Sequence, residues 1–281
     1  MTETATLETE TALAGVGLHT GLHCRAVFKP SRAGSAITFR RADVKGAAPV
    51  AALLGNVNST VRGTNLSAGG SEVFTVEHIL SACAGLGITD LAVELDGPEP
   101  PIMDGSARAF AAAFAAAGIV RTGGRIQTLS VDRALEYRAG DAVYTAKPAA
   151  EKVFRFIFEH PHPLVGRQEF VFEPARQDYA AVIAPARTFG FEEELAWLRQ
   201  AGLAKGGSLE NAVVVTGTEF LSAEGGLRFP DELARHKILD LLGDLALCGL
   251  PLAGVEITAL RGGHRHNAGF GRLLLERGVR N

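Results

Sequence analysis

The spacing of apolar and polar positions along the chain predicts short strands that alternate with helices. Residues 36–40 and 91–95 alternate between apolar and polar with a period of two, which is typical of strands with one buried face. Between them, an apolar run over 76–84 lies between Thr75 and Gly85, so we expect a helix that Thr75 caps. The same criteria predict strands over 128–131, 153–158, 212–216 and 255–260, and helices over 106–117, 192–200 and 231–247.

Two distant segments of the chain resemble each other. Residues 77–88 and 235–252 each contain a histidine near a helix start, an apolar helix body, a glycine turn and a following strand. This similarity predicts two related α+β halves, and two unrelated helices that share common residues explain it equally well. Residues 121–125 contain two glycines, interrupt the pattern and are the expected linker. The predicted domains are therefore 1–123 and 124–281.

One face of the helix over 231–247 carries polar groups. At about 100° per residue, four side chains fall within an arc of about 100°, namely His236, Lys237, Asp240 and Asp244. Such a face is ordinarily the solvated side of an amphipathic helix. A solvated face is normally rich in Lys, Glu and Arg, however, whereas His and Asp one turn apart can bind one metal ion. From the spacing alone, both interpretations stay open.

A catalytic metal centre needs a third protein ligand, and His78 is the best candidate. It lies in the first turn of the helix expected over 76–84, beside Glu77, whose carboxylate can accept a proton from a water at the metal. A histidine near a helix start is more often a packed or capping residue, so the hypothesis depends on the pairing with His236 and Asp240. The H-E-x-x-H pattern of many metalloproteases is absent.

The remaining histidines and the glycine clusters are less informative. Because Gly262 and Gly263 precede His264, we expect a flexible loop that presents this imidazole to a substrate, with an ordinary surface turn as the alternative. The glycine clusters match neither the dinucleotide fingerprint nor the P-loop, so no nucleotide cofactor is expected. We expect surface or turn roles for the histidines at His19, His23, His160 and His162.

Composition narrows the class of protein. The 281 residues are 47% hydrophobic and 21% charged, as in globular proteins, and the net charge of −3 argues against a nucleic-acid partner. Three cysteines without a C-x-x-C spacing argue against a disulfide framework and against a thiolate zinc site. The longest small or apolar run, over 109–120, is too short to cross a membrane, and the acidic start is unlike a signal peptide. We therefore expect a cytoplasmic protein without a transmembrane segment.

Seven motifs together resemble a known family. In chain order they span Gly15–Gly21, Thr75–Leu80, Pro101–Ala107, Arg187–Phe191, Gly206–Ala212, Arg235–Leu245 and Gly263–His264. They resemble the UDP-3-O-acyl-N-acetylglucosamine deacetylases, LpxC, of lipid A synthesis, from about residue 7 to 275. The resemblance implies a cytoplasmic, monomeric enzyme of a Gram-negative-type bacterium, with one Zn²⁺ per chain, that removes acetate from a UDP-linked acylated glucosamine. A zinc peptidase or other amidohydrolase, and an inactive binding protein on the same scaffold, are the alternatives.

The resemblance also implies a fold and an acyl site. The family fold is a two-domain α+β sandwich, each half a small β-sheet with helices packed between the sheets, and each half carries an insert. Residues 192–216 are similar to the βαβ insert that forms the acyl passage. Leu195, Ala204, Ser208 and Val214 are the positions expected to line that passage. A lysine that contacts the diphosphate in some members falls at or near Ala142.

Further roles follow from motif position in the resemblance. The zinc ligands would be His78, His236 and Asp240, the same three residues that spacing suggested, with Glu77 as the general base. The acid partner would be His264, oriented by Asp244, with Thr188 helping to hold the oxyanion. Contacts to the sugar and phosphate would come from Lys237, Phe189 and Phe191, and the contact to the uridine from Phe158.

Overall fold

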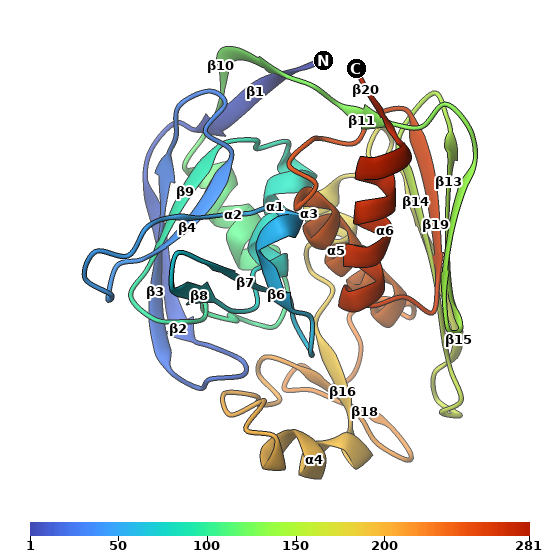
Figure 1. Ribbon diagram of the computed structural model, residues 1–281. Coiled ribbons are helices and arrows are strands. Elements are labelled where there is room, and N and C mark those ends of the chain that lie inside the picture. Colours follow the sequence, from blue (N-terminus) through green and yellow to red (C-terminus); the bar gives the residue numbers. More distant parts are fainter.

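Two five-stranded sheets form the outer layers of the protein. The computed structural model describes residues 1–281, and Figure 1 shows the sheets on either side of a layer of helices. The first sheet has the order β2-β3-β9-β4-β5. Its strands are β2 (Thr11–Val16), β3 (His23–Pro30), β9 (Leu91–Leu95), β4 (Ile37–Arg41) and β5 (Val50–Ala51). The second sheet has the order β12-β13-β19-β14-β15. Its strands are β12 (Leu135–Ala139), β13 (Ala142–Pro148), β19 (Val255–Leu260), β14 (Val153–His160) and β15 (Gly166–Phe172).

The two sheets have the same topology. In each, one central pair is parallel, β4 with β9 and β14 with β19, and the other neighbours are antiparallel. A helix of the inner layer connects each parallel pair, as a crossover between parallel strands requires. The internal similarity of the sequence therefore corresponds to a repeated fold, and the interpretation as two unrelated helices is wrong.

Helices fill the space between the sheets. They are α1 (Glu77–Leu86), α2 (Arg108–Ala116), α3 (Tyr179–Val182), α5 (Glu232–Ala246) and α6 (His264–Arg277). The two related helices α1 and α5 cross closely, because a Cβ on Gly243 would lie 2.1 Å from the carbonyl oxygen of Glu77. One hydrophobic core contains side chains of both halves. The expected fold, a sandwich with helices between two sheets, is confirmed.

The ends of the predicted helices shift for local reasons. Helix α1 begins at Glu77 without a side-chain cap, since Thr75 adopts a φ of +52° and its hydroxyl donates to the buried Glu99. The helix continues past Gly85, where the Tyr179 ring leaves no room for a Cβ, and ends at Gly87 in the left-handed conformation. Helix α2 likewise begins two residues after the expected cap.

The expected linker is a strand. Residues 121–125 belong to β10 (Ile119–Ile126), which pairs antiparallel with β1 (Thr2–Leu7). Gly124 is required there because a Cβ would lie 2.6 Å from Thr4 Oγ1. Figure 1 shows β10 running along one end of the molecule from the first sheet toward the second. The predicted boundary between residues 123 and 124 falls inside this strand and stays a prediction.

Each half carries an insert before its crossover helix. The first consists of η1 (Leu54–Asn56), β6 (Val57–Ser59), β7 (Asn65–Ala68) and β8 (Ser71–Val73). The second consists of β16 (Phe189–Phe191), η2 (Glu192–Glu194), α4 (Leu195–Gln200), β17 (Val213–Val215) and β18 (Phe220–Leu221). Because β16 and β17 are parallel, the second insert is a βαβ unit that begins three residues before the expected position. Two short strands, β11 (Leu129–Ser130) and β20 (Val279–Arg280), pair near the C-terminus.

None of the helices has the length and apolar character that crossing a membrane requires.

Candidate metal centre and active site

The polar face of α5 is buried. His236, Asp240 and Asp244 are 2%, 1% and 0% exposed, because α1 and α6 pack against this helix. The interpretation of this face as the solvated side of an amphipathic helix is therefore wrong. The spacing of polar positions along the helix cannot reveal this burial, since it depends on which helices lie alongside.

Two helices bring three possible metal ligands together. His78 comes from the first turn of α1, and His236 and Asp240 come from adjacent turns of α5. One ligand atom from each lies within 4.8 Å of the other two, and all three residues are buried. The two imidazole rings meet edge to face, with centroids 5.3 Å apart. This group is the one that the sequence spacing suggested.

The chemistry of the three donors fits a metal ion. His78 Nδ1 and Asp240 Oδ1 are buried without a hydrogen-bond partner, which is costly unless a ligand satisfies such atoms. His236 Nδ1 donates to the carbonyl oxygen of Ala186 at 3.1 Å, so its Nε2 carries the lone pair, 3.4 Å from Asp240 Oδ1. Two imidazoles and a carboxylate are ligands that zinc accepts.

Burial keeps the two histidines in the state that metal ligation needs. It lowers the pKa of His78 to about 4 and the pKa of His236 to about 3, so both imidazoles are neutral at pH 7. The pKa of Asp240 is held well below its usual range, because His236 and Lys237 outweigh the opposing effect of burial. The residues therefore present two neutral nitrogens and one carboxylate.

Glu77 lies beside this group. Its Oε2 accepts a hydrogen bond from the backbone N–H of Thr64 at 2.9 Å, while Oε1 lies 3.8 Å from His264 Nε2. Burial, together with the charges of Asp244 and Asp240, raises the pKa of Glu77 to about 7, against the lowering effect of His264. A carboxylate with such a pKa can accept and release a proton near neutral pH.

His264 is the first residue of helix α6, so the expectation of a flexible loop is wrong. Its Nδ1 donates to Asp244 Oδ2 at 2.9 Å, which directs Nε2 toward Glu77 and Asp240, 3.8 and 3.9 Å away. Burial alone would lower the pKa of His264, but the surrounding carboxylates, Asp244 foremost, raise it to about 10. The imidazole is therefore cationic at neutral pH.

Three residues that support this pair escaped the sequence analysis. Asp244 accepts further hydrogen bonds from Thr64 Oγ1 at 2.5 Å and from Asn267 Nδ2 at 2.8 Å. Tyr144 Oη in turn donates to Asn267 Oδ1 at 2.5 Å and accepts from the backbone N–H of Gly263. Asn267 stands three residues after His264, on the same face of α6, so recognition of that helix in the sequence would have found it.

A cleft of about 100 Å³ opens onto these groups. Thr188, Phe189 and Lys237 line it together with the possible metal ligands, Glu77 and His264. Lys237 Nζ lies 2.7 Å from Asp240 Oδ2 and 5.1 Å from the centre of the Phe189 ring. Two further lining residues, Leu18 and Arg62, had no proposed role. The cleft is small, and its polar walls converge on the three possible ligands.

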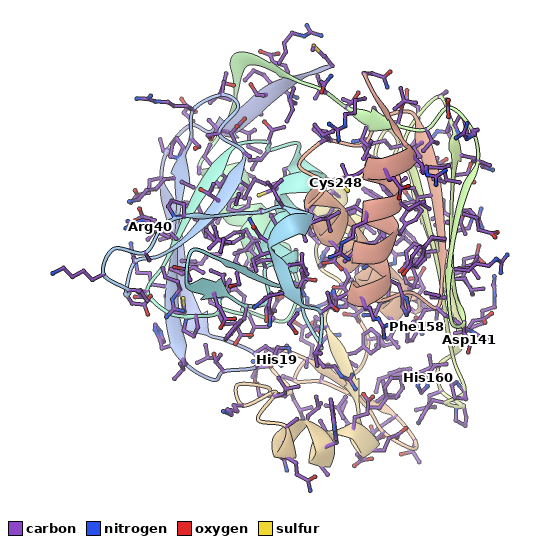
Figure 2. All side chains as sticks on the ribbon, in the orientation of Figure 1. His19, Arg40, Asp141, Phe158, His160 and Cys248 are labelled. Atoms are coloured by element: carbon purple, nitrogen blue, oxygen red, sulfur yellow. The ribbon has the colours of Figure 1, made fainter.

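The expected uridine contact, Phe158, lies beyond the cleft on β14, and Phe191, an expected sugar or phosphate contact, lies beyond it on β16. The Phe158 ring meets Phe189 edge to face at 5.3 Å, and Phe191 stacks on His160 with centroids 4.0 Å apart. Figure 2 shows Phe158 and His160 near each other toward the second insert. His160 thus belongs to an aromatic cluster rather than to a free surface turn.

The residues expected to line an acyl passage all belong to the second insert, and none of them lines the cleft. Leu195, Ala204 and Val214 are half-buried, and Ser208 is exposed. Ala142, at the position expected for a diphosphate contact, is buried at the start of β13. Their assignment to acyl and diphosphate binding stays a prediction.

His19 lies in a turn, as expected, and also connects three parts of the molecule. Its Nδ1 accepts from the backbone N–H of Ala204 in the second insert, at 3.3 Å. Its Nε2 therefore donates to the carbonyl oxygen of Arg62 in the first insert, at 3.0 Å, and its backbone N–H donates to Glu99. In Figure 2, His19 lies where the first half meets the second insert.

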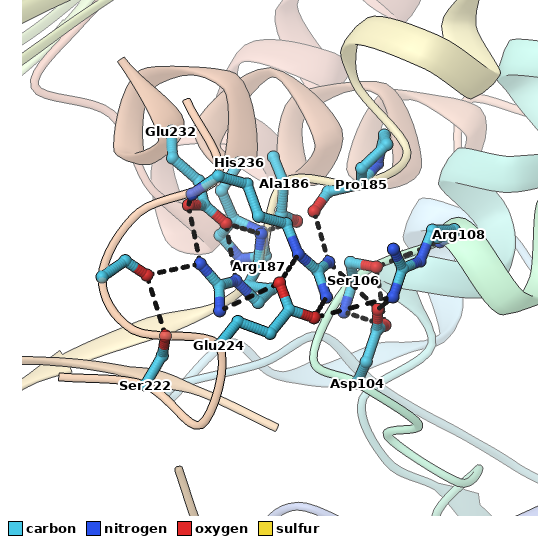
Figure 3. Close-up of polar contacts among 12 residues, drawn as sticks. Asp104, Ser106, Arg108, Pro185, Ala186, Arg187, Ser222, Glu224, Glu232 and His236 are labelled. Atoms are coloured by element: carbon cyan, nitrogen blue, oxygen red, sulfur yellow. Dashed lines mark hydrogen bonds and ion pairs between the residues drawn. The ribbon is translucent and has the colours of Figure 1, made fainter. Parts of the chain in front are cut away.

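A buried ion pair fixes the segment that precedes β16. Arg187 donates to Glu232 through its backbone N–H, Nε and Nη2, at 2.9, 2.8 and 3.0 Å, and the two side chains are 3% and 0% exposed. Arg228 extends the network to Asp104 and to the carbonyl oxygen of Pro185. Figure 3 shows Asp104 and Pro185 near Arg187 and Glu224. The network thus holds the segment that offers the Ala186 carbonyl to His236 and Thr188 to the cleft.

Comparisons with known proteins identify the family of the chain. The family model described as LpxC, UDP-3-O-acyl N-acetylglycosamine deacetylase, matches residues 4–276. The chain belongs to this family. Among its relatives, the UDP-3-O-acyl-N-acetylglucosamine deacetylase of Myxococcus xanthus (strain DK1622) is 42% identical over 93% of this chain and 83% of its own. The enzymes of the same name from Geobacter sp. (strain M21) and Brucella melitensis biotype 2 (strain ATCC 23457) are 40% and 37% identical. They cover 97% and 94% of this chain, and 88% and 92% of their own. The LpxC resemblance is therefore confirmed.

Proposed function

We propose that this LpxC family member hydrolyses the N-acetyl group of UDP-3-O-acyl-N-acetylglucosamine, giving UDP-3-O-acyl-glucosamine and acetate, the committed step of lipid A biosynthesis. The observation that carries the proposal is the buried group of His78, His236 and Asp240, which faces Glu77 and His264 across one cleft. A catalytically silent binding protein would have no need for this costly burial of ionisable groups.

One zinc ion per chain is the metal that this donor set fits best. The ion would be held by His78, His236 and Asp240, and its binding would compensate for the hydrogen-bond partners that His78 Nδ1 and Asp240 Oδ1 lack. Zinc supplies Lewis acidity that polarises the acetamide carbonyl and makes an attacking water more acidic. Ala186 orients one of the ligands through its hydrogen bond to His236, which fixes the tautomer.

Glu77 would act as the general base. The Thr64 amide holds its Oε2, so Oε1 is free to take a proton from the attacking water. His264 would then stabilise the developing negative charge and give its Nε2 proton to the departing amine, while Asp244 fixes the ring through Nδ1. The Thr188 hydroxyl would donate to the oxyanion, and its backbone N–H is held by the Gly105 carbonyl at 2.7 Å.

Substrate recognition would surround this centre. The ammonium of Lys237 and the ring of Phe189 lie at the cleft and suit a sugar and its phosphate, to which we also assign Phe191, and the ring of Phe158 suits stacking on uracil. We assign the acyl chain to the second insert, at the positions Leu195, Ala204, Ser208 and Val214. We further propose that the protein is a cytoplasmic monomer. Size-exclusion chromatography with light scattering measures its mass in solution and so tests the monomeric state.

A direct assay tests the activity. Purified protein is incubated with UDP-3-O-acyl-N-acetylglucosamine, and released acetate and free amine are measured with and without a chelator. We expect turnover that the chelator abolishes and that one equivalent of zinc restores. Acetylated peptides serve as the comparison substrates, because a zinc peptidase would share the ligands without sugar recognition. Turnover of peptides but not of the UDP-sugar would overturn the proposed substrate.

A further inference from the structure

A second and larger cavity lies between the two halves. Its volume is about 500 Å³, against about 100 Å³ for the cleft, and the two share no lining residue. The walls come from β4 and the last turn of α1 in the first half, and from β14, β15 and the last turns of α5 in the second. His78 lies in the first turn of α1, and His236 and Asp240 lie in the second and third turns of α5, whereas the cavity is lined by the C-terminal turns of both helices.

This position separates the cavity from the proposed reaction. Strands β1 and β10 form part of its rim, and Figure 1 shows them at the end of the molecule opposite the second insert. The acyl chain of a substrate bound at the cleft would be directed toward that insert. The helix layer separates the cavity from the cleft and from that insert, so the cavity is not part of the proposed acyl passage.

The walls of the cavity are mainly apolar. Phe154 and Phe172 of the second sheet face Leu242 and Leu245 of α5, and Ile37 closes the wall on the side of the first sheet. A volume of this size falls in the range of roughly 300–1,000 Å³ that small-molecule sites occupy. An apolar surface of this kind suits an alkyl chain rather than a sugar or a nucleotide.

One charged side chain that lines this cavity is partly buried. Four charged residues line it, and Glu3, Arg121 and Glu151 are exposed at its rim. Lys152 is half-buried, and burial lowers the pKa of its ammonium, against which only the charge of neighbouring Glu151 acts. No carboxylate forms an ion pair with Lys152 and no acceptor receives a hydrogen bond from it. A partly desolvated cation without an acceptor costs free energy that an anionic ligand group would offset.

The helix ends fix the direction of such a ligand. The C-terminal turns of α1 and α5 carry partial negative charge and reach the cavity wall through Gly87 and Ala246. An anion is therefore disfavoured at the helix side and favoured at Lys152, which directly precedes β14. A chain extending from Lys152 would run along Phe154 and Phe172 toward Leu245.

We propose that this cavity is a second ligand site, which binds a single-chain anionic amphiphile with its head group at Lys152 and its alkyl chain between the two halves. The expected ligand has one alkyl chain and one anionic head group. The head group is either a carboxylate or a phosphate, and the binding experiment distinguishes the two. Because the site shares no residue with the cleft, the proposal does not depend on the deacetylase activity.

Binding is measured by calorimetry on the full chain with dodecanoate and dodecyl phosphate, below their micelle concentrations. Dodecanol and dodecyltrimethylammonium are the neutral and cationic controls. We expect at least one anion to bind at least about tenfold more tightly than dodecanol, which corresponds to about 1.4 kcal/mol for the charge-assisted contact. The tighter of the two anions identifies the head group. Equal binding of dodecanol and both anions, or binding of neither anion, would overturn the proposal.

Two lysine variants locate the head group. Lys152→Met should weaken binding of the preferred anion about tenfold and leave dodecanol unchanged. Lys147→Met is the matched control, because Lys147 lies in the same sheet but is exposed, pairs with Glu256 and does not line the cavity. An unchanged anion affinity in Lys152→Met would refute the assignment.

A competition experiment separates the two sites. Saturating UDP-3-O-acyl-glucosamine should leave dodecanoate or dodecyl phosphate binding unchanged, whereas full displacement would place the amphiphile in the acyl passage and refute the second site. Ala253→Trp, which fills the cavity from its loop, should abolish anion binding while the deacetylase rate persists. If thermal unfolding shows that this variant is not folded, the Lys152→Met comparison and the competition decide the question.

Discussion

At the scale of single residues, Glu77 and His78 are adjacent in the chain but have separate proposed roles. His78→Ala removes one of three ligands, so we expect loss of both bound zinc and activity. Glu77→Gln leaves the ligands intact, so we expect zinc to stay bound while kcat falls about 10²–10⁴-fold. Metal analysis and the deacetylase rate measure both effects, with exposed His23→Ala as the control. A Glu77→Gln protein of normal rate would exclude Glu77 as the base.

The same residues predict the pH dependence of kcat/KM. Glu77 must be deprotonated to act as a base, so the rate rises as pH increases through its pKa, which burial raises to about 7. His264 must be protonated to act as an acid, so the rate falls as pH increases through its pKa, which the carboxylates around it raise to about 10. We expect a bell-shaped profile whose alkaline limb is lost in His264→Asn. A wild-type profile that shows no fall as pH increases through the pKa of His264, about 10, would contradict the acid role.

At the scale of elements, the Arg187–Glu232 pair joins the start of α5 to the segment before β16. Glu232→Gln removes one charge of a buried pair, so we expect the free energy of unfolding to fall by about 3 kcal/mol, and zinc affinity to fall because the Ala186 carbonyl is less well held. Urea unfolding and chelator competition measure the two changes. Glu224→Gln is the control: this carboxylate is half-exposed and pairs with Arg228, so we expect a loss below about 1 kcal/mol. Similar losses in both variants would contradict the proposed importance of the buried pair.

Element types were easier to predict than element ends. The long periodic helix around His236 was found to within one residue at each end, since its apolar face extends over four turns. Helix α6 was missed because two glycines before His264 indicated a loop, whereas Tyr144 packs against Gly262 so closely that no Cβ fits. Thr75 was a plausible helix cap, but its hydroxyl donates instead to the buried carboxylate of Glu99, which lies in a distant loop. Both errors arise from contacts between residues far apart in the chain.

At the scale of the whole molecule, one core shared by both halves encloses all the cysteines. Cys24, Cys83 and Cys248 are buried and free, and Figure 2 shows Cys248 in the interior. Burial, aided by Asp96 at Cys24, raises the pKa of Cys24 and of Cys248 to about 12, and burial raises that of Cys83 further. Few thiolates therefore form at pH 8. We expect a thiol reagent to label none of the three in native protein and all three in guanidinium chloride. Rapid labelling of native protein would show that the core opens readily.

The sequence by itself predicted a mixture of strands and helices and proposed the three possible ligands, because these depend on local periodicity and on His and Asp one turn apart, while the two-half sandwich followed from the family resemblance. Only the tertiary structure decided that the polar face of α5 is buried, that Asn267 and Tyr144 support Asp244, and that His19 joins the two inserts. It also created the cavity beside Lys152, since neither half encloses that space alone. The physical reason is the same in each case: burial and hydrogen-bond partners are set by segments that meet only when the two halves pack together.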